Sequence, residues 1–321
     1  MTRDVVIDIM KGVAILTVIA GHSIPSDSLG HQLIYSFHMP LFFIVAGYLY
    51  KPCVQHKKRL KNDFHRLILP YLVIAICFTL YLFIKETNNI FTLKYSIIAI
   101  FWATGWNHTS LIWGTAPYIG IAWFLPALFW CRQIYNFIYC HTKHGGEYII
   151  IGLSFMATNI DYYLINLPLG LLTGLSAMVF YQIGYYAHSK KTNNVYLLFL
   201  GAVCWLLHLK FFGIDMCICS YGFYPVDVIG ASFATAIIYY CSKHLSWTYL
   251  GKLLGNFGKV SLYIYCFHAM ENHIRPYEWL ALADVWYLEI PIRTAWCISG
   301  AYAYLILKEF YMKVQKKIVR S

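Results

Sequence analysis

The sequence predicts an all-α protein that is embedded in a membrane as a single domain, residues 1–321, built as a bundle of about ten transmembrane helices. Of its residues, 60% are hydrophobic and only 12% are charged, whereas about 25% are charged in soluble proteins. Apolar runs near the length that crosses a bilayer recur from end to end. Aromatic residues make up 18% of the chain, and Tyr and Trp are typical of membrane interfaces. The lipid bilayer is therefore an expected partner.

The spans are expected at ten apolar segments, each close to the length that a bilayer requires. These segments are residues 5–24, 33–50, 67–84, 121–140, 148–165, 168–187, 194–212, 226–243, 260–274 and 288–308. A further apolar stretch, residues 95–106, is shorter and ends in Gly105 and Trp106. It is either an eleventh span or an interfacial segment.

The charge pattern decides between these two topologies. Lys and Arg gather after the second, sixth and eighth spans and near the end of the chain. With ten spans and Arg3 inside, all of these clusters are cytoplasmic, as the positive-inside rule requires. The sequence thus predicts that both termini are cytoplasmic and that residues 95–120 lie at the outer face. The net charge of +11 does not indicate a nucleic-acid partner, because the chain lacks the spacing of RNA-binding and zinc-finger modules.

The cysteines and the first apolar run indicate the cellular setting. The ten Cys lie mostly within apolar runs, where a thiol behaves as a small hydrophobic group, and they show no metal-binding spacing. The first run contains Asp8 and Lys11 and lacks a small-residue cleavage site, so we expect a retained span instead of a signal peptide. No metal cofactor is expected. The expected location is the cell membrane, as a multi-pass protein, which in a bacterium is the inner membrane.

The first span carries three ionisable residues, Asp8, Lys11 and His22. Ionisable side chains inside a membrane are costly and mark functional sites. Asp8 and Lys11 are three positions apart, so they share a helix face and can pair. His22 follows Lys11 by eleven positions, which is about three turns and roughly 16 Å along the axis. One face therefore presents a cation near the cytoplasmic end and an imidazole near the outer end. The alternative is an ion pair that only orients the helix.

Two further spans contain polar side chains. His38 lies near the outer end of the second span and is a candidate second catalytic or substrate-binding group, or else a structural hydrogen-bond partner. In the ninth span, His268 and Glu271 are three positions apart, so they can pair. They are expected either to line the same cavity as His22 or to form a purely structural pair.

Several of these segments resemble the membrane acyltransferase 3 family, and most closely its fucose 4-O-acetylase-like branch. The specific matches are the first span from Asp8 to His22 and the segment 37–43, FHMPLFF, with Gly47 and Tyr48. Segments 123–129, WFLPALF, and 261–268 are weaker matches. The matches keep family order across most of the chain. Much of the family has Arg at the position of Lys11, so the positive charge is kept but the planar bidentate fork is not.

The resemblance implies transfer of an acyl group, usually acetyl, from cytoplasmic acetyl-coenzyme A to a hydroxyl of a cell-envelope glycan or its lipid-linked precursor. His22 is then either the general base for the sugar hydroxyl or a transient carrier of the acyl group. Asp8 holds Lys11, which orients the donor or stabilises developing charge. His38, His268, Glu271 and Trp123 are the candidate contacts to the carbohydrate substrate.

The dense basic loop 51–66 is a candidate site for the anionic donor. Lys58, Arg59 and Arg66 are its candidate phosphate contacts, although a cytoplasmic loop needs no ligand to be basic.

Three different functions are also compatible with polar residues inside spans. A transporter uses such residues as a proton relay, but the inverted repeats and broken spans typical of transporters are not apparent in the sequence. A non-catalytic membrane scaffold or sensor is the second possibility. A zinc site formed by His22, His38 and His268 is the third, and no ligand spacing favours it.

Overall fold

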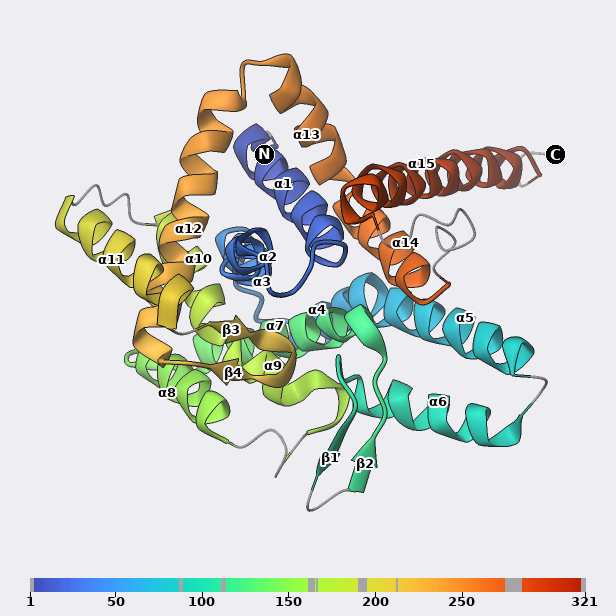
Figure 1. Ribbon diagram of the computed structural model, residues 1–321, viewed down its shortest axis with the longest axis horizontal. Helices are drawn as coiled ribbons and strands as arrows, with labels where there is room; N and C mark the ends of the chain where they lie inside the picture. The colour runs from blue at the N-terminus through green and yellow to red at the C-terminus, as the bar shows by residue number, and fades with distance from the viewer. Residues whose placement is uncertain are drawn as a thin grey trace. The chain divides into compact units, whose positions relative to one another are not determined.

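The structure is a computed structural model that describes residues 3–86, 89–110, 114–160, 165, 167–189, 195–211, 213–274 and 285–318 (Figure 1). Its contacts divide the chain into two compact units. The first unit combines Met1–Pro25 with Ser242–Ser321, and the second is Ser26–Cys241. The first unit is therefore made of the two ends of the chain, while the second is one continuous segment.

Four helices form most of the first unit, and helix α1 runs along α13 (Figure 1). These helices are α1 (Val5–Gly21), α13 (Tyr249–Lys259), α14 (Ser261–Ile274) and α15 (Trp286–Ile318). Helix α1 begins after Asp4, whose carboxylate accepts hydrogen bonds from the backbone N–H groups of Val6 and Ile7. Such a capping side chain satisfies donors that a helix start leaves without partners.

Glycines allow α1 and α13 to approach closely. A Cβ atom on Gly12 would collide with the backbone oxygen of Leu254, and one on Gly258 would collide with the backbone oxygen of Asp8. Small residues at such crossings are typical of helix pairs in membranes, where tight packing replaces the hydrophobic effect. The close contact holds the Asp8 turn of α1 against the end of α13.

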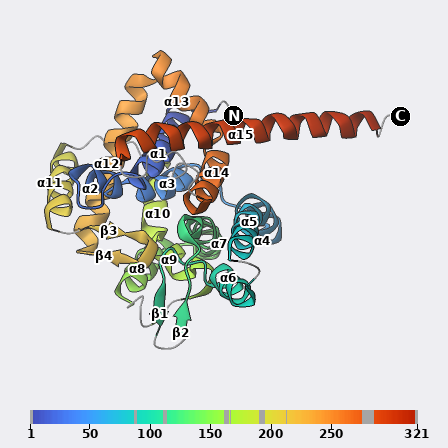
Figure 2. The ribbon, with the colours of Figure 1, turned by 45° about the vertical axis from the view of Figure 1, so that its right-hand side comes forward.

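Helix α15 extends well past α1 and α14 (Figure 2). From Tyr302 to Gln315, every residue except Leu305 is exposed, and the exposed side chains include Ile306, Leu307 and Phe310. An exposed surface of this apolar character is expected where a helix faces lipid.

The second unit is built from helices and two short hairpins. Its helices are α2 (Leu29–Tyr35), α3 (His38–Tyr48), α4 (His56–Asp63), α5 (Leu69–Lys85), α6 (Ile90–Trp102), α7 (Phe124–His141), α8 (Gly146–Asn159), α9 (Leu171–Ser176), α10 (Met178–Ser189), α11 (Val195–Phe211) and most of α12 (Tyr224–Leu245). A π-helical turn, Phe64–Ile68, joins α4 to α5. The hairpins pair β1 (His108–Ser110) with β2 (Gly114–Ala116) and β3 (Ile214–Asp215) with β4 (Ser220–Tyr221).

Helices α3 and α10 form a second close pair that also depends on glycine. A Cβ on Gly47 would collide with the backbone oxygen of Tyr181, and one on Gly184 would collide with the backbone oxygen of Ile44. Because both glycines lie at the crossing, neither helix can carry a larger residue there without moving apart.

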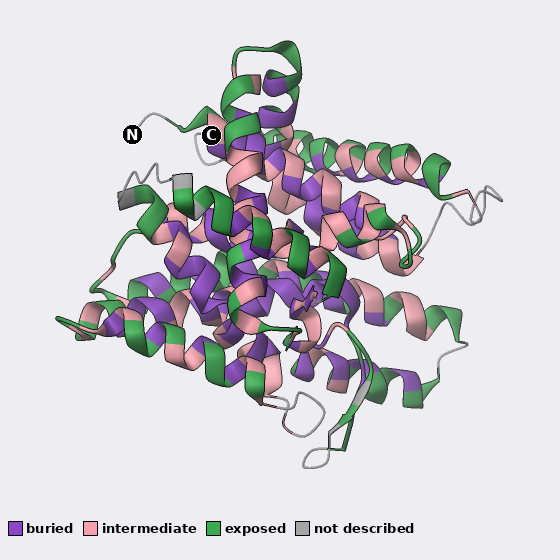
Figure 3. Ribbon diagram, turned by 60° about the vertical axis from the view of Figure 1, so that its left-hand side comes forward, coloured by how far each residue is buried: buried purple, intermediate pink, exposed green. Residues whose placement is uncertain are grey.

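The prediction of an all-α protein is confirmed. Among the described residues, four helical segments are long and apolar enough to cross a membrane: Leu29–Tyr48, His56–Lys85, Tyr224–Leu245 and Trp286–Gln315. Between 17% and 39% of each such segment is buried, so much of its apolar surface is left for lipid. Figure 3 shows that the helices carry buried residues and exposed residues together. The total of ten spans and the cytoplasmic position of both termini stay predictions.

Two local predictions were wrong, and a third segment has different bounds from those expected. Segment 51–66 was expected to be a loop, but α4 and the π-helical turn occupy most of it, because Lys and Arg are good helix formers. Residues 95–102 belong to helix α6, which begins earlier, at Ile90, and ends at Trp102, and the position of this segment at the outer face stays a prediction. The predicted continuous span 168–187 is divided into a short 3₁₀ turn, α9 and α10.

The break between α9 and α10 has a structural cause. The backbone oxygen of Ser176 accepts a hydrogen bond from the Ser154 hydroxyl at 2.5 Å and from the Tyr221 hydroxyl at 3.5 Å. A carbonyl freed by a broken helix is tolerated at membrane depth only when protein groups satisfy it. These partners come from α8 and β4, which no local pattern in 168–187 reveals.

Candidate active site

The ion pair predicted on α1 is present. Asp8 is buried, and its Oδ1 lies 2.7 Å from the Nζ of Lys11. Arg3 adds a second cation, with its Nε 2.5 Å from Asp8 Oδ2. The Lys11 side chain keeps 21% of its surface exposed, so it is held by Asp8 but is still reachable. The carboxylate thus fixes two cations at the start of α1.

His22 is the residue that ends α1, directly after Gly21, and it is half-buried. Its ring centroid lies 5.4 Å from that of His268, which is fully buried on α14. The two histidines are almost 250 positions apart in sequence, yet they are neighbours within the first unit. The structure therefore brings together two of the predicted site residues.

Glu271 links His268 to a buried arginine. Its Oε2 lies 3.1 Å from the Nδ1 of His268, and its Oε1 lies 2.9 Å from the Nε of Arg293. The first contact follows from their three-residue spacing on α14. A carboxylate at Nδ1 favours the tautomer that carries its proton there and leaves Nε2 as an acceptor. Within the described residues, the buried Nε2 of His268 has no hydrogen-bond partner.

Arg293, on α15, is a site residue that the sequence analysis missed. Its side chain is 1% exposed. Nη1 donates to the backbone oxygen of His22 at 2.7 Å and to the Ser23 hydroxyl at 3.0 Å, and Nη2 donates to Asn272 at 2.9 Å. Arg293 therefore fixes the His22 backbone and Glu271 together. An arginine inside the predicted tenth span was the available signal, since such residues are costly in a membrane.

We name His22, His268, Glu271 and Arg293 the imidazole cluster. Cys297 is also close, and one atom from each of His268, Glu271 and Cys297 lies within 4.8 Å of the others. These are donor types that bind transition metals. However, Arg293 occupies one oxygen of Glu271 and adds a positive charge that repels a cation. The arrangement favours a hydrogen-bonded chain over a metal site.

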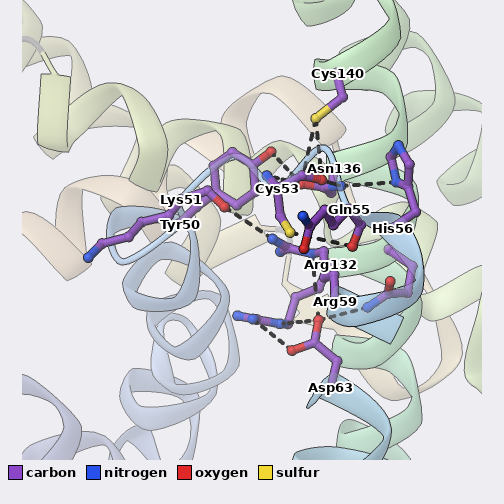
Figure 4. A network of polar contacts seen from close by, with 11 residues as sticks. Tyr50, Lys51, Cys53, Gln55, His56, Arg59, Asp63, Arg132, Asn136 and Cys140 are labelled. Carbon is purple, nitrogen blue, oxygen red and sulfur yellow. Dashed lines mark hydrogen bonds and ion pairs between the residues drawn. The ribbon is translucent and has the colours of Figure 1, made fainter. Parts of the chain in front are cut away.

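A second buried polar group lies in the second unit, where α4 meets α7 (Figure 4). Asp63 is its centre. Arg132 contacts both carboxylate oxygens, with Nη2 2.9 Å from Oδ1 and Nε 3.2 Å from Oδ2. Gln133 donates to Oδ2 at 2.7 Å. Arg59 approaches the same oxygen, with its Nε at 3.6 Å. We name Arg59, Asp63, Arg132 and Gln133 the guanidinium cluster.

Arg59 has hydrogen-bonding capacity to spare. It is 8% exposed, its Nη1 donates to the backbone oxygen of Lys51 at 3.1 Å, and its guanidinium lies 5.0 Å from the ring centre of Tyr50. Its buried Nη2 has no hydrogen-bond partner among the described residues. Two arginines share the single carboxylate of Asp63, which leaves one excess positive charge in the cluster. Such a site has the charge and the donors to receive an anion.

The three predicted donor contacts are thus not equivalent. Lys58 and Arg66 are exposed, whereas Arg59 turns into the cluster. The π-helical turn lies between Arg59 and α5, and such turns are frequent at functional sites. Asn136 holds the preceding segment in place, because its amide pairs with the backbone of Cys53 at 2.9 and 3.0 Å and accepts from the Tyr50 hydroxyl at 3.0 Å.

The remaining two predicted residues are packed inside the second unit. His38 is buried, its Nδ1 lies 2.9 Å from the backbone oxygen of Ile34, and Tyr35 packs edge-on against its ring at 4.6 Å. Trp123 is also buried, close to Gly105 and Cys217. These contacts suit a structural role as well as a binding role, so their substrate contacts stay predictions.

Comparisons with known proteins place the chain in a family. No curated protein and no solved structure matches it. A family model described as an acyltransferase domain matches residues 4–307, which is nearly the whole chain and includes both clusters. The chain therefore belongs to the acyltransferase 3 family, and it is a membrane acyltransferase.

Proposed function

We propose that this protein is an O-acyltransferase that moves an acyl group, in the first instance acetyl, from acetyl-coenzyme A to a hydroxyl of a cell-envelope glycan or of its lipid-linked precursor. The observation that supports this proposal most is the imidazole cluster. A half-buried histidine at the end of α1 stands beside a second histidine, which a buried carboxylate and arginine hold in place. Acyl transfer to a hydroxyl requires such a proton acceptor.

In the proposed reaction, the hydroxyl oxygen attacks the thioester carbonyl while His22 takes the hydroxyl proton. An ester C–O bond forms, the thioester C–S bond breaks, and the proton passes from His22 to the departing thiolate. His268 and Glu271 orient His22 and stabilise its charged form, as a carboxylate does for a histidine in other acyl-transfer sites. In a two-step version, His22 carries the acyl group itself and then passes it to the hydroxyl.

Lys11 and Asp8 support this chemistry from the other end of α1. Because Lys11 lies about three turns from His22, its cation is proposed to orient the donor from the cytoplasmic end of the helix. Asp8 holds the lysine in place by the 2.7 Å contact. Because Lys offers a point charge in place of the guanidinium fork, we propose that the charge at this position matters more than bidentate geometry.

The guanidinium cluster is proposed to bind the phosphates of the donor. Arg59 is the leading contact because it combines burial, an excess of positive charge nearby and an Nη2 without a hydrogen-bond partner in the described part of the chain. Lys58 and Arg66 are exposed and are proposed to attract the anionic donor from solution. His38 and Trp123 are proposed to contact the sugar. We also propose that the protein belongs to the fucose 4-O-acetylase-like branch of the family and that it is located in a bacterial inner membrane.

The experiment compares purified protein in lipid bilayers with its His22→Ala variant. Acceptor-dependent release of coenzyme A from acetyl-coenzyme A is measured, together with the mass of the glycan product. Loss of a general base is expected to slow transfer by about 10²-fold to 10⁴-fold. His244→Ala is the matched control, because His244 is exposed at the end of α12. Unchanged transfer by His22→Ala would remove His22 from the mechanism, and absence of thioester consumption by the unaltered protein would contradict the function itself.

A further inference from the structure

A cleft in the second unit lies outside both clusters. It has a volume of about 300 Å³ and is lined by the last turn of α7, the middle of α10, residues 142–144 and the first turns of α8. Tyr139, Lys143, Glu147, Gln182 and Tyr185 are the lining residues that matter here. The walls thus combine aromatic rings with charged and amide groups, which is typical of sites for small polar ligands that contain a flat ring.

Gln182 supplies the first sign of a ligand. Its side chain is 5% exposed, and its buried Oε1 has no hydrogen-bond partner among the described residues. A buried amide oxygen without a partner carries the full cost of its lost hydration. A ligand with an N–H or amino group in the cleft would remove that cost.

The other end of the cleft favours an anion. Helix α8 has 14 residues and begins after Gly145, whose φ of 79° is suited to glycine, and no side chain caps its N-terminus. The first turn of a helix carries a partial positive charge and attracts phosphate groups. Lys143 and His144 lie beside this helix start and are exposed. Glu147, in the first turn, is available to accept a hydrogen bond from a hydroxyl.

Aromatic rings connect the cleft to the guanidinium cluster. Tyr139 and Tyr185 join their hydroxyl groups at 2.5 Å, with ring centroids 5.2 Å apart. Both rings contact Tyr50, at 5.6 and 5.7 Å. The guanidinium of Arg59 lies over the same Tyr50 ring, 5.0 Å from its centroid. These packed aromatic contacts therefore place the cleft next to the guanidinium cluster.

We propose that this cleft binds the adenine nucleotide end of the acyl donor. The adenine ring packs on Tyr139 and Tyr185 and its amino group donates to Gln182 Oε1. The 3′-phosphate lies at Lys143 and the start of α8, the ribose hydroxyl donates to Glu147, and the diphosphate is left for the guanidinium cluster. This assignment rests on the proposed function for the identity of the donor. It adds to that function the cleft between α7, α8 and α10 as the site that recognises the nucleotide. The thioester end then extends past Tyr50 and Arg59.

The direct test measures binding of adenosine 3′,5′-bisphosphate, which carries the nucleotide without the thioester, to the full chain in detergent. Gln182→Ala and Lys143→Ala are each expected to weaken binding by about fivefold or more, since each loses one hydrogen bond or charge contact. Lys143→Ala changes an exposed residue, so it keeps the test informative if Gln182→Ala does not fold. Gln32→Ala, at an exposed glutamine of the same unit, is expected to bind as the unaltered protein does.

A second measurement separates the cleft from the reaction. In transfer assays, Gln182→Ala is expected to raise the KM for acetyl-coenzyme A but to leave the rate with S-acetyl-N-acetylcysteamine unchanged, because this short donor has no nucleotide. Bisphosphate binding without any acyl transfer would support the cleft and contradict the proposed function. Failure of the bisphosphate to bind, or equal binding by all variants, would overturn the assignment.

Discussion

The two buried polar clusters are built on the same plan but differ in what completes them. In each, one carboxylate holds an arginine at 2.9 Å, Glu271 with Arg293 and Asp63 with Arg132. In the first unit the carboxylate also contacts His268, which lies beside His22. In the second unit it is shared with Arg59. The first cluster therefore contains two imidazoles, whereas the second contains a second guanidinium and so has an excess of positive charge.

This difference indicates a division of labour. An imidazole is the side chain that exchanges protons near neutral pH, whereas a guanidinium keeps its charge and binds carboxylates and phosphates. In the proposed function, the imidazole cluster carries out proton transfer and the guanidinium cluster holds the donor. Changes in the first cluster should therefore lower kcat, and changes in the second should raise the KM for the donor.

The largest effect is expected from Glu271→Gln. The glutamine keeps the shape but removes the charge that orients His268 and balances Arg293. We expect kcat to fall by about 10²-fold or more, as for other groups that hold a catalytic imidazole in its working tautomer. The KM for the donor should change little. Steady-state kinetics measures both constants. A change in the KM for the donor without a change in kcat would contradict the proposed division of labour between the two clusters.

A loss of stability has to be separated from this effect. Removing one partner of a buried ion pair costs about 3–5 kcal/mol when the other charge is left alone, and Glu271→Gln removes the 2.9 Å carboxylate contact of Arg293, whereas the contact with Glu289 is longer, at 3.9 Å. The melting temperature in detergent is therefore measured for the same preparation. Arg293→Lys keeps the positive charge beside Glu271, so a folded preparation of this variant should retain part of kcat. If unfolding alone explained the loss of kcat, this variant would lose stability and activity in parallel.

An intermediate effect is expected from Arg59→Ala. The variant loses a buried charge-assisted contact, which is worth about 1.5–3 kcal/mol, so the KM for acetyl-coenzyme A should rise about tenfold or more while kcat is nearly kept. Lys58→Ala is the matched control, because Lys58 is adjacent in sequence but exposed. Equal effects of the two variants would show that only the overall charge of segment 51–66 matters.

The smallest effect is expected from Lys11→Arg. Arginine keeps the positive charge beside Asp8, so we expect activity within about threefold of the unaltered protein, since a change of this size is less than about 1 kcal/mol. Lys11→Ala removes the charge and should reduce kcat by about tenfold, which corresponds to about 1.4 kcal/mol. Full activity of Lys11→Ala would show that this cation is dispensable for transfer.

The sequence predicted those parts of the site that depend on helical spacing. Asp8 with Lys11 and His268 with Glu271 are three positions apart, and this spacing places side chains on one face of any helix. The contact between His22 and His268 and the role of Arg293 were beyond prediction, because they depend on how α1, α14 and α15 pack. Residue spacing within one helix does not determine such packing.

The basic segment shows the same limit at a finer scale. Composition alone made Lys58, Arg59 and Arg66 equal candidates for contacts to the donor phosphates. Of these three, only Arg59 contacts Asp63, which in turn binds Arg132 of α7. Which of these residues is buried depends on the phase of α4 relative to α7 and on the π-helical turn. The all-α class was predictable because hydrophobic run length determines it. The break at Ser176 was not, because its hydrogen-bond partners are distant in sequence.

The most direct test of the division of labour is the rate of acyl transfer by His22→Ala at a concentration of acetyl-coenzyme A shown to saturate that variant. We expect donor binding to equal that of the unaltered protein while transfer of the labelled acetyl group to the glycan slows by about 10²-fold to 10⁴-fold. Transfer at the unaltered rate by the saturated variant would contradict it.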